Sequence, residues 1–88
     1  MRPLTAPVSP RYRGAKIDLN LKAADIHDVF RTLARVGRTN IVVADTVKGS
    51  VTMALHRVPW DQALATLVAV NQLNMVYRDG VYLITAKR

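Results

Sequence analysis

The chain contains no cysteine, which excludes disulfide bridges, thiolate nucleophiles and zinc-finger sites. It also contains no glutamate, so all six acidic residues are aspartates. No segment approaches the roughly 18 uninterrupted apolar residues of a membrane-spanning helix. The first seven residues carry a positive charge without an apolar stretch behind them, and they therefore do not predict a signal peptide.

What is present is enough for one small domain with a packed core, because half of the 88 residues are hydrophobic. Thirteen Lys and Arg residues against six Asp give a formal charge of +7. Such a charge permits contact with nucleic acid, acidic lipid or an acidic protein surface. Because the basic residues are scattered and several lie near the chain ends, their simpler interpretation is solubility.

The proline distribution suggests where the folded part begins. Residues 1–15 hold three of the four prolines and little apolar periodicity, which predicts a flexible arm before a domain over residues 16–88. Alternation of apolar and polar residues predicts a first strand over 16–21. A helix should follow, capped by Asp25 and ended by a left-handed residue at Gly37.

The second half of the chain repeats this order of elements. The expected elements are a buried strand at 40–44, a turn at 48–50, a strand at 51–55, a helix at 59–71, and strands at 75–78 and 81–84. The last two strands flank Asp79-Gly80, a pair typical of type I′ hairpin turns. The order strand, helix, strand, strand, helix, strand, strand predicts a compact α+β domain with helices packed on small sheets.

The start of the second helix is the most informative stretch. Pro59 suits the first turn of a helix, and Asp61 places a carboxylate near the positive end of the helix dipole. Trp60 begins an apolar face at helical spacing. From this spacing, and from that of the first helix, we expect five residues in the core: Phe30, Leu33, Trp60, Leu64 and Leu67.

The sequence offers little for catalysis. His27 and His56 are isolated from any ligand cluster, so we expect no metal site, with His27 on a helix surface and His56 at a strand end. Asp25 and Asp28 are explained by helix capping and the helix dipole rather than by acid–base chemistry. No serine lies in a nucleophile elbow and no glycine-rich loop could hold a phosphate. We therefore expect a non-enzymatic domain without a cofactor.

Two binding functions remain. Tyr77 and Tyr82 could stack on bases, but aromatic residues in a hairpin more often pack across the strands. Alternatively, short strands in small sheets leave free edges that can accept strands from a protein partner. Exposed polar residues of the first and third strands, with the lysine of the preceding turn, are the candidate partner-binding residues: Lys16, Asp18, Asn20, Lys48, Ser50 and Thr52.

Four segments, in order and at the right spacing, resemble the short N-terminal domain shared by secretins and TonB receptors. They are IDLNL (17–21) with ADIHDVF (24–30), TNIVV (39–43), VKGSVT (47–52) and VPWDQAL (58–64). The last is most similar to secretins of type IV pilus systems. Glutamates common on the family's helices are absent, so the helix surface is more basic than usual in the family.

The resemblance implies two helices sandwiched between a two-stranded and a three-stranded sheet. It implies a non-catalytic, periplasmic protein-interaction domain of an outer-membrane secretin of the type IV pilus or type II secretion type. Such a domain forms part of the periplasmic entrance ring, contacts inner-membrane assembly components and associates with itself. One alternative within the family is a periplasmic signalling domain of a TonB-dependent transducer that binds an anti-sigma regulator. The alternative outside it is a small basic nucleic-acid-binding domain.

Overall fold

A computed structural model of the chain describes residues 14–87, so nearly all of the arm expected at residues 1–15 lies outside the described residues. The elements follow the predicted order: β1 (Lys16–Asp25), α1 (Ile26–Gly37), β2 (Asn40–Val43), β3 (Ser50–Pro59), α2 (Trp60–Val70), β4 (Leu73–Arg78) and β5 (Val81–Ala86). The predicted α+β class is confirmed. The first and third strands are longer than predicted and reach the helices that follow them.

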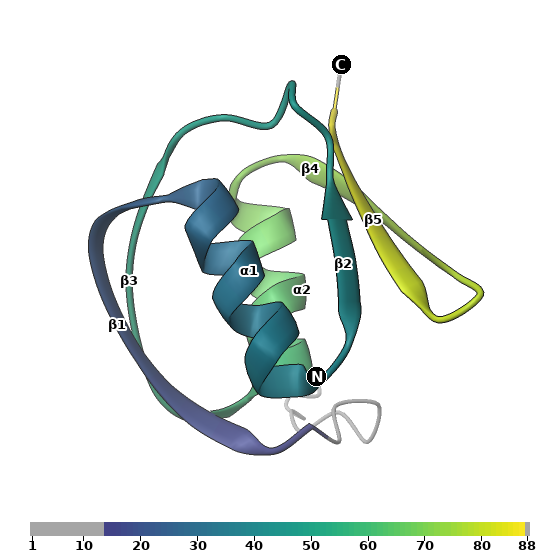
Figure 1. Cartoon of the computed structure of the whole chain (residues 1–88). Helices are drawn as coiled ribbons and strands as arrows, with labels where there is room; N and C mark the ends of the chain where they lie inside the picture. Colours follow the sequence, from purple (N-terminus) through teal and green to yellow (C-terminus); the bar gives the residue numbers. More distant parts are fainter. Residues whose placement is uncertain (1–13, 88) are drawn as a thin grey trace, which may run out of the picture.

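The elements form three layers, with the two helices between two small sheets (Figure 1). β1 and β3 pair antiparallel and form a two-stranded sheet, called here the β1–β3 ribbon. The other sheet has the order β2-β5-β4, in which β2 is parallel and β4 antiparallel to β5. The arrangement expected from the family resemblance is therefore confirmed.

The core lies where the helices meet the inner faces of both sheets. Four of the five residues expected there, Phe30, Leu33, Leu64 and Leu67, are almost completely buried. Trp60 is the exception: it is only partly buried and packs against the rim of this cluster. Its position follows from its place at the first residue of α2, where its backbone N–H donates to the carbonyl oxygen of Ala15 at 3.0 Å.

The N-terminus of α1 is held as predicted. Asp25 is the cap residue, and its carboxylate accepts the backbone N–H of His27 at 2.8 Å. The imidazole of His27 is partly buried, and its Nε2 lies 2.6 Å from the carbonyl oxygen of Val47. His27 therefore joins α1 to the loop before β3, whereas the sequence suggested a plain surface position.

The replacement Asp25→Ala is expected to lower the free energy of unfolding by about 1 kcal/mol, because the His27 N–H loses its acceptor. Urea denaturation would measure this loss. Asp25→Asn is the matched control, since asparagine keeps an acceptor at the cap and should leave stability nearly unchanged. Equal losses in the two variants would show that the charge, and not the cap, stabilises the helix.

The position predicted for the left-handed residue at the end of α1 is wrong by one residue. Arg38, with φ of 52°, takes this conformation, and its backbone N–H donates to the carbonyl groups at the end of the helix. Gly37 is required for a different reason. A Cβ atom there would lie 2.6 Å from the ring of Trp60, far inside normal contact distance. The glycine thus makes room for the tryptophan.

The hairpin between β4 and β5 agrees with its sequence signal. Asp79 and Gly80 have φ of 54° and 80°, as a type I′ turn requires. Tyr77 and Tyr82 lie directly opposite one another, and their ring centroids are 4.6 Å apart. Trp60 meets Tyr82 edge to face at 6.3 Å. Burial, aided by the nearby Tyr77 and Asp61, raises the pKa of Tyr82 above its ordinary value.

Candidate partner-binding surface

The β1–β3 ribbon carries the candidate binding residues. Within the described residues, each of its strands pairs only with the other, so each strand has one free edge. The ribbon bows around the helices on one side of the domain (Figure 1). All six candidate residues are exposed: Lys16, Asp18, Asn20, Lys48, Ser50 and Thr52.

These six residues are spread along the ribbon and do not form one cluster. Lys16 lies opposite Pro59 at one end, while Ser50 lies opposite Asp25 at the other. A ten-residue strand is about 33 Å long, so the two ends could not contact one small ligand. Lys48 stands in the loop just before β3, near the Ser50 end. The surface therefore suits a partner that runs along a strand.

Two irregularities interrupt the pairing of the ribbon. At each one, the side chain of a candidate binding residue accepts a backbone hydrogen bond. Ala23, with φ of 51°, donates its N–H to Oγ1 of Thr52 at 3.0 Å. Arg57, with φ of 55°, donates its N–H to Oδ1 of Asp18 at 2.8 Å. In each case a side chain from the opposite strand accepts an N–H from a residue of unusual backbone conformation. Asp18 and Thr52 therefore have a structural role in addition to any binding role.

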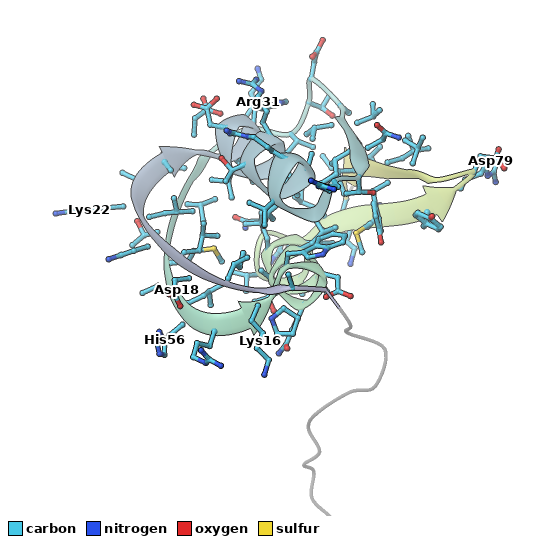
Figure 2. All side chains as sticks on the ribbon, turned by 60° about the horizontal axis from the view of Figure 1, so that its bottom comes forward. Lys16, Asp18, Lys22, Arg31, His56 and Asp79 are labelled. Atoms are coloured by element: carbon cyan, nitrogen blue, oxygen red, sulfur yellow. The ribbon has the colours of Figure 1, made fainter. Side chains whose placement is uncertain are left out.

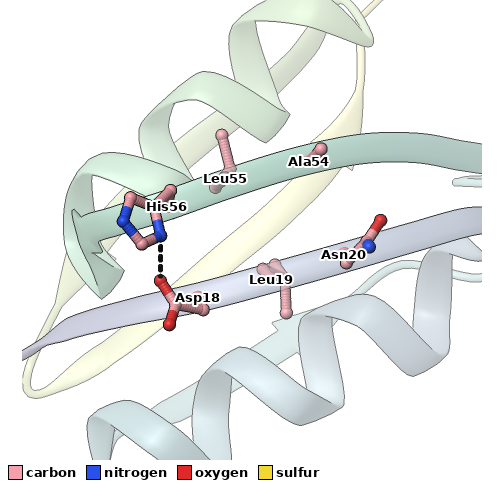
Figure 3. A pocket seen from close by; sticks show the side chains of 6 residues that line it. All are labelled: Asp18, Leu19, Asn20, Ala54, Leu55 and His56. Carbon is pink, nitrogen blue, oxygen red and sulfur yellow. Dashed lines mark ion pairs between the residues drawn. The ribbon is translucent and has the colours of Figure 1, made fainter.

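His56 belongs to the same corner of the ribbon. Its Nδ1 lies 3.0 Å from Oδ1 of Asp18, and both side chains are largely exposed. Figure 3 shows the pair at one end of an open hollow that crosses both strands. Leu19 faces Leu55 across the strands, and Asn20 faces Ala54. Figure 2 shows Lys16, Asp18 and His56 on the same side of the domain.

A groove along β3 was missed by the sequence reasoning. It is lined by six consecutive strand residues, 50–55, by Thr66, Leu67 and Val70 of α2, and by Asn71, which follows the helix. Consecutive residues of a strand point alternately to its two faces. A groove lined by all of residues 50–55 therefore runs along the strand and does not lie on one of its faces. The available signal was the composition of α2, which is apolar nearly all round and so leaves Val70 outside the core.

The described residues offer no group of three or more His, Cys, Asp and Glu side chains that could hold a metal ion. None of the helices among residues 14–87 is long and apolar enough to cross a membrane. The described residues present free strand edges, a groove and exposed polar side chains. A free strand edge can pair with an extended segment of another protein.

Comparison with known proteins identifies the family. Residues 39–87 match the family described as the secretin and TonB N terminus short domain. The chain belongs to this family. The match covers the region from just before β2 to the end of β5, and the predicted resemblance is thereby confirmed.

Named relatives place the domain among secretins. The fimbrial assembly protein PilQ of Pseudomonas aeruginosa is 36% identical over 73 residues, which are 83% of this chain and 10% of that protein. The type IV pilus biogenesis and competence protein PilQ of Neisseria meningitidis serogroup A is 38% identical over 70 residues, or 80% of this chain and 9% of that protein. The chain thus spans about a tenth of the curated relatives it matches.

Solved structures agree with this placement. The type IV competence pilus secretin PilQ of V. cholerae superposes with a TM-score of 0.69 and 31% identity, over 77% of this chain and 16% of that one. The N0 domain of the type II secretin from enterotoxigenic Escherichia coli gives a TM-score of 0.74 over 83% of this chain and 96% of that one. At 17% identity, the second likeness shows a shared fold. The chain is thus similar in sequence to PilQ proteins and shares its fold with a secretin N0 domain.

Proposed function

We propose that this chain is a non-catalytic, periplasmic protein-interaction domain of a type IV pilus secretin. It forms part of the entrance ring of an outer-membrane channel and binds an inner-membrane assembly protein of the same machine. The observation that carries this proposal is the β1–β3 ribbon, which presents two unpaired strand edges and a row of exposed polar side chains. The pilus secretins among the relatives support it over a transducer role.

The proposed mode of binding is strand addition. An extended segment of the partner pairs with a free edge of the ribbon, and the backbone hydrogen bonds give affinity. Asn20, Ser50 and the two lysines at the ends then contribute side-chain contacts. Lys16 and Lys48 stand near opposite ends of the ribbon, so they favour a partner segment whose short paired stretch is flanked on both sides by acidic residues.

The double variant Lys16→Asp with Lys48→Asp tests this surface. We expect binding of the periplasmic part of the inner-membrane assembly protein to weaken at least tenfold, or about 1.4 kcal/mol. Titration calorimetry at two salt concentrations would measure the affinity. Lys87→Asp is the matched control, because Lys87 is exposed beyond β5, which belongs to the other sheet, and its reversal should change the affinity by less than about twofold.

Unchanged affinity in the double variant would remove this ribbon from the binding site. A loss of the same size in Lys87→Asp would show that overall charge, and not this surface, controls the association. Thermal melts of all three proteins check that the fold is retained, since surface substitutions of this kind usually change stability by less than about 0.5 kcal/mol.

A further inference from the structure

The three-stranded sheet has an open edge that the proposed partner contact does not use. Among the described residues, β2 pairs only with β5, and its other edge runs beside α1 (Figure 1). The N–H of Ala44, directly after β2, donates to the carbonyl oxygen of Ile84 at 2.9 Å. Successive residues of a strand direct their backbone groups to opposite edges, so those of Ile41 and Val43 point away from β5.

A hollow of about 220 Å³ lies between this edge and α1. It is lined by four residues of α1 and two of β2, namely His27, Phe30, Arg31, Ala34, Ile41 and Val43. Ile41 and Val43 therefore contribute their side chains to the hollow and their backbone groups to the open edge. Paired residues of neighbouring strands point to the same face, so a segment paired with these two would hold its own inward-facing side chains over the hollow.

The α1 side of the hollow is basic. Arg31 lines it, and the exposed Arg38 follows at helical spacing, just past the end of the helix. Residues 26–43 carry three arginines against one aspartate, Asp28. Asp28 contacts Arg31 at 3.2 Å in an exposed pair, and such pairs are weak. The next aspartate, Asp45, lies past the opposite end of β2. This side of the hollow therefore favours acidic ligands.

We propose that the β2 edge is a second docking site, and that it takes an extended segment of another protein with acidic side chains at alternate positions. The backbone of this segment pairs with Ile41 and Val43. Its inward-facing carboxylates meet Arg31 and Arg38, which lie roughly 10 Å apart along the helix axis. Alternate residues of an extended segment are about 7 Å apart, and the long arginine side chains adjust to the difference. Because β2 has only four residues, these charges set the specificity.

A short capped peptide that alternates glutamate with valine is the probe. In an NMR titration of the isotope-labelled chain, it should shift the backbone amide signals of Ile41, Val43 and Arg31. Near saturation, amide hydrogen exchange at Ile41 and Val43 should slow at least fivefold, because both N–H groups gain acceptors. A matched peptide with lysine in place of glutamate should bind at least tenfold more weakly.

Two N-methylated versions of the probe test the strand pairing. One is methylated on the glutamate nitrogens and the other on the valine nitrogens. In a segment antiparallel to β2, the residues with inward-facing side chains also direct their N–H groups at β2, so methylation of glutamate removes the paired donors. In a parallel segment, the valine nitrogens are the paired donors. One version, and not the other, should therefore lose at least tenfold in affinity.

Charge reversal in the domain tests the basic side of the hollow. Arg31→Glu with Arg38→Glu should weaken binding of the glutamate peptide at least tenfold and make the lysine peptide the tighter ligand. Lys16→Glu with Lys22→Glu is the matched control, because it places the same change of charge on β1 in the other sheet. This control should change either affinity by less than about twofold. Circular dichroism melts confirm that each variant is folded.

Three results would overturn the inference. Amide shifts confined to the β1–β3 ribbon would reject the β2 edge as the site. Equal affinity of the two N-methylated peptides would exclude strand pairing, and equal losses in the two charge-reversed variants would mean that overall charge controls binding. The inference does not depend on the proposed partner role. The partner titration reports on Lys16 and Lys48, whereas this one reports on Ile41 and Val43, so either proposal can fail while the other holds.

Discussion

Phe30→Ala is expected to lower the free energy of unfolding by about 3–5 kcal/mol. Phe30 is 1% exposed and lies on α1 among the buried residues that join both helices to the sheets. Its removal leaves a cavity that the surrounding side chains fill only in part. Domains of this kind have a total stability of about 5–15 kcal/mol, so the loss takes a large share of it.

Thermal denaturation should show the effect directly. For a domain of 60–100 residues, each kcal/mol shifts Tm by about 4–8 °C, so a fall of at least about 12 °C is expected. Val70→Ala is the matched control, since Val70 is exposed and its truncation should change stability by less than about 0.5 kcal/mol. A loss under about 1 kcal/mol for Phe30→Ala would contradict the position of this side chain in the core.

Gly37→Ala is expected to destabilise the domain by about 1–3 kcal/mol, the usual result of overpacking. Helix propensity alone points the other way, because alanine is more favourable than glycine within a helix by up to about 1 kcal/mol. The contact with Trp60 determines whether the substitution stabilises or destabilises the domain. The added methyl group would meet three atoms of the Trp60 ring within 2.8 Å. Urea denaturation of the single variant measures the net effect.

A double-mutant cycle with Trp60→Leu isolates the contact. Without the indole ring, Gly37→Ala should be neutral or stabilising, so the two substitutions should couple by more than about 1 kcal/mol. Additive effects would show that Gly37 is needed for the helix end and not for the tryptophan. Because Trp60 is only partly buried, its own truncation should cost less than the loss expected for Phe30→Ala.

Local signals predicted the elements well. The apolar periodicity of α1, the cap at Asp25 and the turn at Asp79-Gly80 each depend on neighbours within a few residues, and the structure confirms all three. The layered arrangement was accessible only through the family resemblance. Pairing of β2 with β5 joins residues about forty positions apart, and no local pattern specifies such a contact.

The errors arose where tertiary contacts replaced local preference. A glycine at the end of a helical pattern is the usual left-handed residue, but here Arg38 takes that conformation, and Gly37 instead makes room for the ring of Trp60. For the candidate surface, polar alternation correctly predicted that the five strand residues are exposed, and Lys48 of the preceding turn is exposed as well. The bonds of Asp18 and Thr52 to the opposite strand could not be foreseen, because their partners are 39 and 29 residues away.

The two irregularities of the ribbon limit how far a foreign strand can follow it. Between them only three consecutive pairs keep regular register: Leu19 with Leu55, Asn20 with Ala54, and Leu21 with Met53. Bulges bend and twist a strand, so an added strand can stay aligned only over about this short span. Long flat edges, by contrast, are the templates on which chains polymerise. Under the proposed strand addition, the ribbon accepts a short partner strand while resisting uncontrolled sheet growth.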